Sequence, residues 1–484
     1  MLQIPAGLIQ RLHLLDTEML NIENKYEKTL REVHPLNRNS ALNLLKYLYF
    51  RSKDQRDLQE TLHDCGLSSL ASSESHIHRQ LQEILMRLGE NSGFSELDRQ
   101  KGTYAIRKNS DGLFGERSDI QYPSIMVTYE TGFASDPDAI RNLILAGMQV
   151  ARINCAHDNQ DIWLSMIKHT REQSAILGTK VRIYMDMAGP KIRTVIDSTG
   201  KKKDRIKLEE GEVLSLLNRE PKAEHAIGCS LKGIIPYLKK GQKVYFDDGK
   251  VEAKVVSING EDAAILIERI TGKPRLKSRK GINFPDASLP VQSLSDYDIE
   301  CLPFISTHSD MLGYSFVRTA GDIQNMRKEL KDRNLEHIPF VLKIETAEAV
   351  KNLPALLIES MKDRFSGVMI ARGDLALEIG FERLSEIQEE ITWICEAAHI
   401  PVIWATQVLE SLNKSGLATR SEATDASMAG LADCVMINKG KNINLVLESL
   451  LNILKRSTSH RSKKRYIFRT LSIAKGFFQN SDHE

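Results

Sequence analysis

The sequence contains little of what marks a secreted, zinc-binding or membrane-spanning protein. Only six of its 484 residues are cysteines, and no two of them form a C-x-x-C pair. This spacing predicts neither a disulfide framework nor a zinc site. Such cysteine usage is typical of proteins in a reducing compartment. No apolar run approaches the length needed to span a bilayer, and residues 1–7 are too short and too uncharged for a signal peptide. We therefore expect a cytoplasmic protein with no membrane partner.

The sequence also lacks an excess of charge of either sign. The 66 Lys and Arg residues against 64 Asp and Glu residues leave a formal net charge of +2. A protein that binds nucleic acid through bulk electrostatics is usually far more basic, so we expect no nucleic-acid partner. The length and the 41% hydrophobic content allow two or three domains with at least one large core.

The first hundred residues contain no strand-like runs and show helical periodicity instead. Apolar residues recur at helical spacing in 40–52, 57–66 and 75–89, and Gly66 and Gly89 are plausible C-caps. Gly, Ser and charged residues then follow. The sequence therefore predicts a helical N-terminal extension over residues 1–120.

Beyond residue 120 the chain alternates short apolar runs with amphipathic stretches. The eight apolar runs are 124–129, 149–154, 181–186, 312–317, 340–345, 367–372, 401–406 and 434–438. Near-continuous apolar runs are typical of parallel strands that helices cover on both faces. Eight strand–helix units of this kind favour a closed (β/α)₈ TIM barrel over residues 121–194 and 291–484.

One insertion interrupts this alternation. About 120 residues, where about 30 would suffice, separate the third run from the fourth. Within them, residues 204–217, 241–260 and 261–272 alternate with Gly and Asp-Gly turn signals, as in a small antiparallel β domain. The sequence therefore predicts an inserted small β-barrel domain over residues 195–290, placed as a lid above the barrel mouth.

Polar and charged side chains gather where the expected barrel strands end. They are Arg152, Asn154, His157, Asp186, Lys191, Arg193, Lys343, Glu345, Arg372, Asp374 and Thr406. Each has an ordinary structural explanation: Asp186 as a cap, Lys343–Glu345 and Arg372–Asp374 as salt bridges. Because strand ends build the active site of such barrels, their joint occurrence indicates a site for a phosphate ester with a divalent metal.

The carboxylates supply the expected metal ligands. Glu345 and Asp374 offer hard oxygen atoms, and Mg²⁺ typically takes a few protein carboxylates and completes its octahedron with substrate and water. Asp374 also opens a possible short helix after Gly373, whose free amides would face an anionic group. Lys343 lies two residues before Glu345, so both side chains leave the strand on the same side.

These motifs, in this order, resemble those of the pyruvate kinase family. "ARINCAH", "MDMAGPKIRT", "LKIE", "IARGDLALE", "ATQVLES" and "ATRSEATDA" are similar to its core motifs, and "YFDDGKV" and "KGINFPDASLP" to its lid motifs. The resemblance covers residues 122–440. It implies transfer of phosphate from phosphoenolpyruvate to ADP, giving pyruvate and ATP.

The resemblance also implies a role for each matching residue. Lys343 stabilises the phosphoryl group, Glu345 and Asp374 hold Mg²⁺ or Mn²⁺, and Thr406 lies where the enolate is protonated. The implied substrate-binding residues are Arg152, Lys343, Gly373, Asp374 and Thr406, with Arg152, Lys343 and Thr406 as the catalytic set. The implied nucleotide-binding residues are Asn154, His157, Arg193 and Lys280.

Several positions depart from the family pattern. Ala156 replaces a serine that helps to bind K⁺ beside Asn154 and Asp186, and Lys191 replaces a glutamate. A lysine ammonium can take the electrostatic role of a monovalent cation, so we expect that K⁺ is not required. Phe133 stands on the nucleotide side, and Asn438 stands where a hydroxyl of the proton relay is expected.

These departures leave two alternatives to an active kinase. One is a weakened relative that binds phosphoenolpyruvate or a nucleotide and regulates another process. The other is a lyase acting on a pyruvate enolate, although a lyase needs neither the lid nor Lys343. The chain stops about 45 residues after the last expected strand, so we expect no regulation by the family's C-terminal domain. We also expect a homo-oligomer, specifically a dimer.

Overall fold

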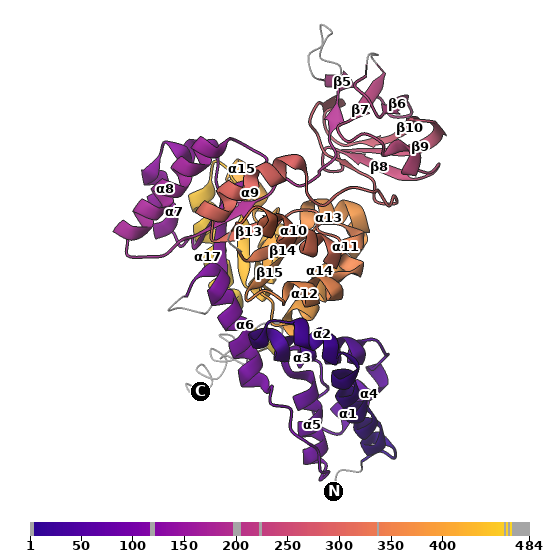
Figure 1. Cartoon of the computed structure of the whole chain (residues 1–484), viewed down its shortest axis with the longest axis vertical. Helices are drawn as coiled ribbons and strands as arrows, with labels where there is room; N and C mark the ends of the chain where they lie inside the picture. Colours follow the sequence, from indigo (N-terminus) through magenta and orange to yellow (C-terminus); the bar gives the residue numbers. More distant parts are fainter. Residues whose placement is uncertain are drawn as a thin grey trace, which may run out of the picture.

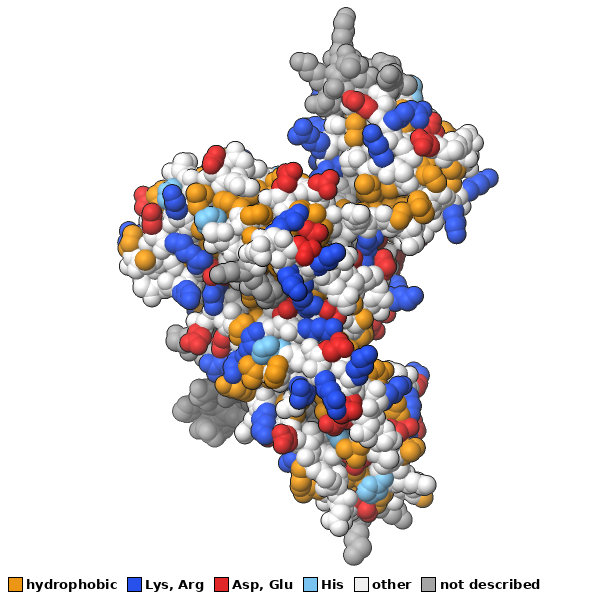
Figure 2. Space-filling model, in the orientation of Figure 1, with side chains coloured by type: hydrophobic (Ala, Val, Ile, Leu, Met, Phe, Trp, Pro, Cys, Tyr) orange, Lys and Arg blue, Asp and Glu red, His pale blue; other side chains and the backbone are white. Residues whose placement is uncertain are grey.

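The computed structural model describes residues 4–116, 122–196, 205–221, 225–335, 338–458, 461–462 and 465–466. It has three regions along its longest axis (Figure 1): a helical N-terminal region, a central barrel, and a β domain joined to the barrel by a narrow waist. The boundary expected at residue 120 falls outside the described residues. On the face shown in Figure 2, side chains of both charge signs are interspersed over all three regions.

The central region is a closed barrel of eight parallel strands, which confirms the predicted fold class. Its strands are β1 (Ser124–Thr128), β2 (Val150–Asn154), β3 (Arg182–Asp186), β13 (Met311–Tyr314), β14 (Phe340–Ile344), β15 (Ser366–Ala371), β16 (Val402–Ala405) and β17 (Cys434–Ile437). They pair in the order β1-β17-β16-β15-β14-β13-β3-β2. Almost every strand residue is buried, since side chains fill the barrel inside and helices cover it outside.

The connecting helices surround this barrel. They are α7 (Pro137–Leu145), α8 (Gln160–Ile176), α9 (Asp296–His308), α10 (Ala320–Asp332), α11 (Ala347–Lys351), α12 (Leu353–Ser360), α13 (Arg372–Ile379), α14 (Leu384–Ala397), α15 (Glu410–Ser415), α16 (Arg420–Met428) and α17 (Ile443–Thr458). Capping boxes at Ser295, Thr319 and Thr419 start α9, α10 and α16. Each box satisfies free backbone N–H groups at a helix start and so sets where the helix begins.

The inserted domain is a seven-stranded sheet with its own apolar core. Its strands pair in the order β12-β8-β9-β10-β6-β7-β4, and β5 pairs separately with β11. Their bounds are β4 (Thr194–Val195), β5 (Arg205–Lys207), β6 (Val213–Leu217), β7 (Ala226–Cys229), β8 (Lys243–Phe246), β9 (Val251–Asn259), β10 (Asp262–Ile270), β11 (Arg275–Lys277) and β12 (Ile282–Asn283). We call this region, from β4 to β12, the lid domain. It stands beyond the carboxyl ends of the barrel strands (Figure 1).

The N-terminal region is all-helical in its described part, as the sequence predicts. Its α-helices are α1 (Leu8–Lys25), α2 (Glu27–Glu32), α3 (Arg38–Arg51), α4 (Arg56–Asp64), α5 (Ile77–Arg87) and α6 (Arg99–Phe114). At the end of α6, Leu113 and Phe114 join the cluster of buried side chains that fills the barrel interior. The region therefore covers the end of the barrel opposite the lid domain (Figure 1). None of the helices in the described ranges is long and apolar enough to cross a membrane.

Buried polar contacts fix this region to the barrel. The Asn43 amide on α3 donates to the carbonyl of Ala397 at 2.8 Å. The ring of His399, which is fully buried, contacts the Ser40 hydroxyl through Nδ1 at 2.8 Å and the Ser75 carbonyl through Nε2 at 2.9 Å. Because unpaired polar groups are costly inside a protein, these contacts select one way for the two regions to dock.

We expect the buried imidazole of His399 to make the protein sensitive to acid. Burial lowers the pKa of His399 to about 4 from its ordinary 6.5. Between these values the unfolded chain binds more protons, so stability falls as the pH drops below 6.5. The free energy of unfolding should decrease by about 2 kcal/mol between pH 7.5 and pH 5 through this group. Denaturant melts of wild type and His399→Gln at both pH values test this: the variant should lose that part of the pH dependence, and equal slopes would contradict it.

Candidate active site

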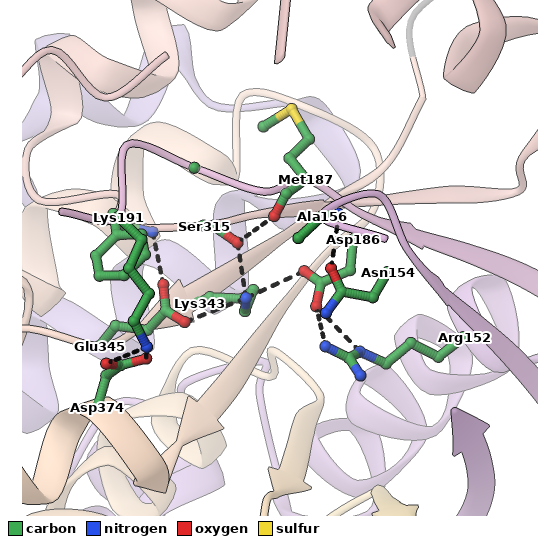
Figure 3. Close-up of polar contacts among 12 residues, drawn as sticks. Arg152, Asn154, Ala156, Asp186, Met187, Lys191, Ser315, Lys343, Glu345 and Asp374 are labelled. Atoms are coloured by element: carbon green, nitrogen blue, oxygen red, sulfur yellow. Dashed lines mark hydrogen bonds and ion pairs between the residues drawn. The ribbon is translucent and has the colours of Figure 1, made fainter. Parts of the chain in front are cut away.

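The polar side chains predicted from the strand ends come together at the lid-facing mouth of the barrel (Figure 3). Arg152 and Asn154 lie in the second half of β2, Asp186 ends β3, Lys343 lies near the end of β14, and Glu345 directly follows β14. Each strand carries its polar residue at its carboxyl end, while the apolar residues before it are locked in the barrel core. The barrel therefore brings together side chains that lie far apart in the sequence.

Asp186 is the centre of this group. Its Oδ2 atom accepts from Arg152 Nε at 3.0 Å and from Arg152 Nη2 at 2.5 Å, and its Oδ1 atom lies 3.2 Å from Lys343 Nζ. The Tyr184 hydroxyl donates to Oδ1 at 3.3 Å. Asp186 is only 1% exposed. Burial alone would raise the pKa of Asp186, but Lys343 and Arg152 hold it below its ordinary value, so the group remains a carboxylate.

Lys343 is a buried ammonium with a complete set of acceptors. Its Nζ atom donates to the Ser315 hydroxyl at 2.7 Å and lies 3.1 Å from Glu345 Oε1. Burial would lower the pKa of Lys343, but Asp186 and Glu345 raise it above its ordinary value. Ser315, whose hydroxyl donates in turn to the Met187 carbonyl at 2.7 Å, was not among the predicted site residues. Its position just after β13 was the signal that could have identified it.

Glu345 and Asp374 present oxygen atoms on one side of Lys343. Burial raises the pKa of Glu345, Lys343 opposes this rise, and the charge of Asp374 adds to it. Two carboxylates that disfavour each other's charge suit a shared divalent cation. No group of three or more His, Cys, Asp or Glu residues within the described ranges could hold a metal. Mg²⁺ usually binds proteins through one or two carboxylates and takes the rest of its shell from substrate and water, and Glu345 and Asp374 would suffice for that.

Asn283 at the end of the lid domain links Asp374 to a second acidic residue. Its amide nitrogen lies 3.3 Å from Asp374 Oδ1 and 3.3 Å from Glu378 Oε1. Burial raises the pKa of Glu378 to about 7, and the charge of Asp374 adds to the effect. Glu378 therefore carries a partial proton at neutral pH, beside the segment that joins lid and barrel.

We expect the Glu378→Gln variant to be more stable than wild type in alkaline but not in acidic solution. The folded state holds the proton of Glu378 up to about pH 7, whereas the ordinary pKa is 4.5. Wild-type stability is therefore lost as the pH rises through this window, while a glutamine has no proton to lose. The difference should grow by about 2 kcal/mol between pH 5 and pH 8. Thermal melts of both metal-free proteins at these pH values provide the measurement; a constant difference would refute the expectation.

Thr406 and Gly373 lie together beside the mouth. Thr406 has a positive φ of 64°, and its buried hydroxyl has no hydrogen-bond partner among the described residues. A Cβ atom on Gly373 would lie 3.9 Å from Thr406 Cγ2. Gly373 and Asp374 are in the first turn of α13, where N–H groups lack partners within the helix. This corner thus offers one hydroxyl and free amides to a bound anion.

Arg372, in contrast, has a structural role. It ion-pairs with Asp425, rather than with Asp374, and donates to the Ala405 carbonyl at 2.9 Å. Its guanidinium also lies over the Trp404 ring, 4.9 Å from the centroid. It is 7% exposed and holds α13 and α16 to the barrel.

A second part of the site is a cavity of about 450 Å³ beside Arg152. Asn154, His157, Asp248 and Lys439 also line it. Burial lowers the pKa of His157, and the neighbouring Lys439 lowers it further. The cavity therefore combines the cations Arg152 and Lys439 with neutral donors, and the carboxylates Asp158, Asp248 and Glu410 also line it. Asn438 lines it as well, and its carbonyl is held by the Asn413 amide at 2.8 Å.

Three further residues singled out in the sequence do not line this cavity. Phe133 is buried with its ring 4.9 Å from that of Tyr129, so it fills the core. Arg193 donates to the carbonyl of Arg279 at 3.2 Å, and Lys280 ion-pairs with Asp247 at 2.8 Å. Arg193 and Lys280 thus lie at the base of the lid domain and are engaged with it.

Lys191 lies on the side of the group formed by Glu345 and Asp374. Its ammonium is 2.8 Å from Asp374 Oδ1 and 3.0 Å from Oδ2. Figure 3 shows Lys191 and Asp374 on the opposite side of Lys343 from Arg152 and Asn154. The structure thus brings Asp186 and Lys343 together but gives Lys191 a different carboxylate from the one expected for a monovalent-cation site.

Comparisons with known proteins point to one family. The family model described as "Pyruvate kinase, barrel domain" matches residues 122–442. The chain is 33% identical over 329 residues to pyruvate kinase 1 of Trypanosoma brucei brucei, covering 65% of this chain and 63% of that protein. It is 30% identical over 341 residues to the pyruvate kinase of Thermotoga maritima, covering 69% and 70%. It is 34% identical over 311 residues to that of Encephalitozoon cuniculi, covering 63% and 67%. The matched part thus spans somewhat under two thirds of the length of the trypanosomal relative.

Proposed function

This chain belongs to the pyruvate kinase family, and we propose that it transfers the phosphoryl group of phosphoenolpyruvate to ADP, giving pyruvate and ATP. The observation that carries the proposal is the position of Lys343. Its buried ammonium lies between Asp186 and Glu345, with Asp374 nearby, and therefore faces the point where a metal-bound phosphoryl group would sit. Phosphoryl transfer depends mainly on such positioning and charge neutralisation.

Glu345 and Asp374 are the residues that would hold Mg²⁺ or Mn²⁺. When bound, the metal neutralises charge on the phosphoryl group and orients the substrate. Asp186 keeps Arg152 and Lys343 in place, and these two cations bind the phosphoryl oxygens. Because both side chains are buried, they lose little conformational freedom when substrate arrives.

The other residues bind the rest of the two substrates. In this proposal the amides at the start of α13 bind the carboxylate, and the Thr406 hydroxyl, which is buried and has no hydrogen-bond partner among the described residues, takes part in protonation of the enolate. Asn154 and His157 in the 450 Å³ cavity contact the nucleotide, together with Arg193 and Lys280 at the base of the lid domain. Protonation of the enolate makes the transfer to ADP favourable.

Purified protein with phosphoenolpyruvate, ADP and Mg²⁺ tests the proposal directly. Pyruvate and ATP should form in equal amounts. If neither forms while phosphoenolpyruvate still binds, the chain is a regulatory relative. Asn438, which stands where a hydroxyl of the proton relay is expected, is the residue that favours this alternative. If pyruvate forms only from an aldol substrate, the chain is a lyase.

We expect the reaction to proceed without K⁺. Ala156 offers no hydroxyl, Asn154 Oδ1 already accepts from the Ala156 N–H at 3.0 Å, and Asp186 is already paired with two cations. These contacts leave little negative charge at this position for K⁺ to neutralise. Lys191 adds a further positive charge at the same mouth of the barrel. Initial rates in tetramethylammonium salt should stay within about twofold of those in potassium salt at equal ionic strength. A rate that falls tenfold or more without K⁺ would show that the expectation is wrong.

A further inference from the structure

We infer that Lys191 competes with the divalent metal for the carboxylate of Asp374. Its ammonium pairs with this carboxylate in the metal-free protein and must leave it before the cation binds. The inference rests on the metal site of the proposed function. It concerns binding of the ion, and not the chemistry that follows.

The contact between Lys191 and Asp374 engages both carboxylate oxygens. The Nζ atom is 2.8 Å from Oδ1 and 3.0 Å from Oδ2, so a metal that uses either oxygen meets the ammonium. The two side chains are 19% and 15% exposed, which removes much of the solvent screening that weakens surface pairs. An ion pair that is partly shielded from solvent in this way is stronger than one on the exposed surface.

The surroundings of Lys191 keep its ammonium at this position. A Cβ atom on Gly281 would lie only 2.7 Å from Lys191 Cε. The lysine side chain therefore packs directly against Gly281, where a larger residue would displace it. Asp248 of the lid domain lies 3.8 Å from the same ammonium. Lys191 thus lies between a barrel carboxylate and a lid carboxylate, and the second one can receive it when it leaves the first.

Even after the Lys191 ammonium has moved to Asp248, it would lie only a few ångströms from a divalent ion on Asp374, because the two carboxylates lie 3.8 Å and 2.8 Å from its present position. Like charges so close repel each other strongly in a partly buried site. The lysine therefore lowers metal affinity in the absence of substrate. The metal binds well only when substrate oxygens complete its shell and offset this repulsion, which links metal loading to substrate arrival.

Mn²⁺ binding to substrate-free protein, measured from the electron paramagnetic resonance signal of the free ion, tests this inference. Lys191→Met should bind Mn²⁺ about tenfold more tightly than wild type, since removing a partly buried like charge is worth about that factor. Gly281→Ala keeps the lysine but displaces its tip, and it should shift the affinity in the same direction. Asp374→Asn should bind weakly whether or not Lys191 is present.

The matched control is Lys250→Met. Lys250 is an exposed lysine of the lid domain that pairs with Asp247 at 3.0 Å. This variant should bind Mn²⁺ as wild type does. Equal or weaker binding by folded Lys191→Met would overturn the inference, even if the protein makes pyruvate. Tighter binding would support it, even if no pyruvate forms, so the two proposals fail independently.

Discussion

Replacing Lys343 by methionine is expected to reduce pyruvate formation at least about a thousandfold. Methionine fills nearly the same space but cannot donate to Ser315 or neutralise a phosphoryl group. The ammonium lies 3.2 Å from Asp186 and 3.1 Å from Glu345, so no other cation can replace it from the same position. The measurement is a coupled pyruvate assay at saturating phosphoenolpyruvate, ADP and Mg²⁺.

Two controls separate this loss of chemistry from a loss of folding. Lys331→Met removes an exposed lysine near the carboxyl end of α10 and should leave the rate unchanged. A thermal melt of Lys343→Met should show a folded but less stable protein, because Asp186 and Glu345 lose one cation while Asp186 keeps its pair with Arg152. If folded Lys343→Met keeps more than a tenth of the wild-type rate, Lys343 does not stabilise the transferred group.

The Asp186→Asn variant is expected to lose about 3–5 kcal/mol of unfolding free energy. The carboxylate is 1% exposed and is shared by Arg152 and Lys343, both themselves buried. Its removal leaves two buried cations without their common anion, and an uncompensated buried charge is among the most costly defects in a protein. Denaturant melts of the two proteins at neutral pH measure the loss.

An anion added from solution should partly reverse the loss in Asp186→Asn. Inorganic phosphate can bind between the two cations, so it should raise the melting temperature of this variant more than that of wild type. Asp332→Asn, an exposed position at the end of α10, is the control and should melt as wild type does. A loss below 1 kcal/mol in Asp186→Asn would show that Arg152 and Lys343 do not depend on this carboxylate.

The barrel was predictable from the sequence because its strands are buried on both sides. The part of β15 from 367 to 371 carries no polar side chain, and that pattern is visible without coordinates. The Asp-Gly turn in the inserted domain is equally local, since residues 247–249 adopt the positive φ values that these residue types favour. Helix starts such as Thr319 also follow from neighbours in the chain.

The partners of the charged residues were not predictable in the same way. The sequence allowed a pair between Arg372 and Asp374, but Arg372 pairs with Asp425, and Lys191 takes Asp374 from 183 positions away. Ser315 became part of the site only because β13 lies next to β14 in the closed barrel. None of these pairings has a local signal.

The sequence by itself determined which segments form strands and helices, and which chemical groups end each strand, because both depend on burial and on near neighbours in the chain. Only the tertiary structure decided which ammonium meets which carboxylate. Barrel closure sets the distances between strand ends, and the energy of a charge pair changes steeply over a few ångströms and with burial.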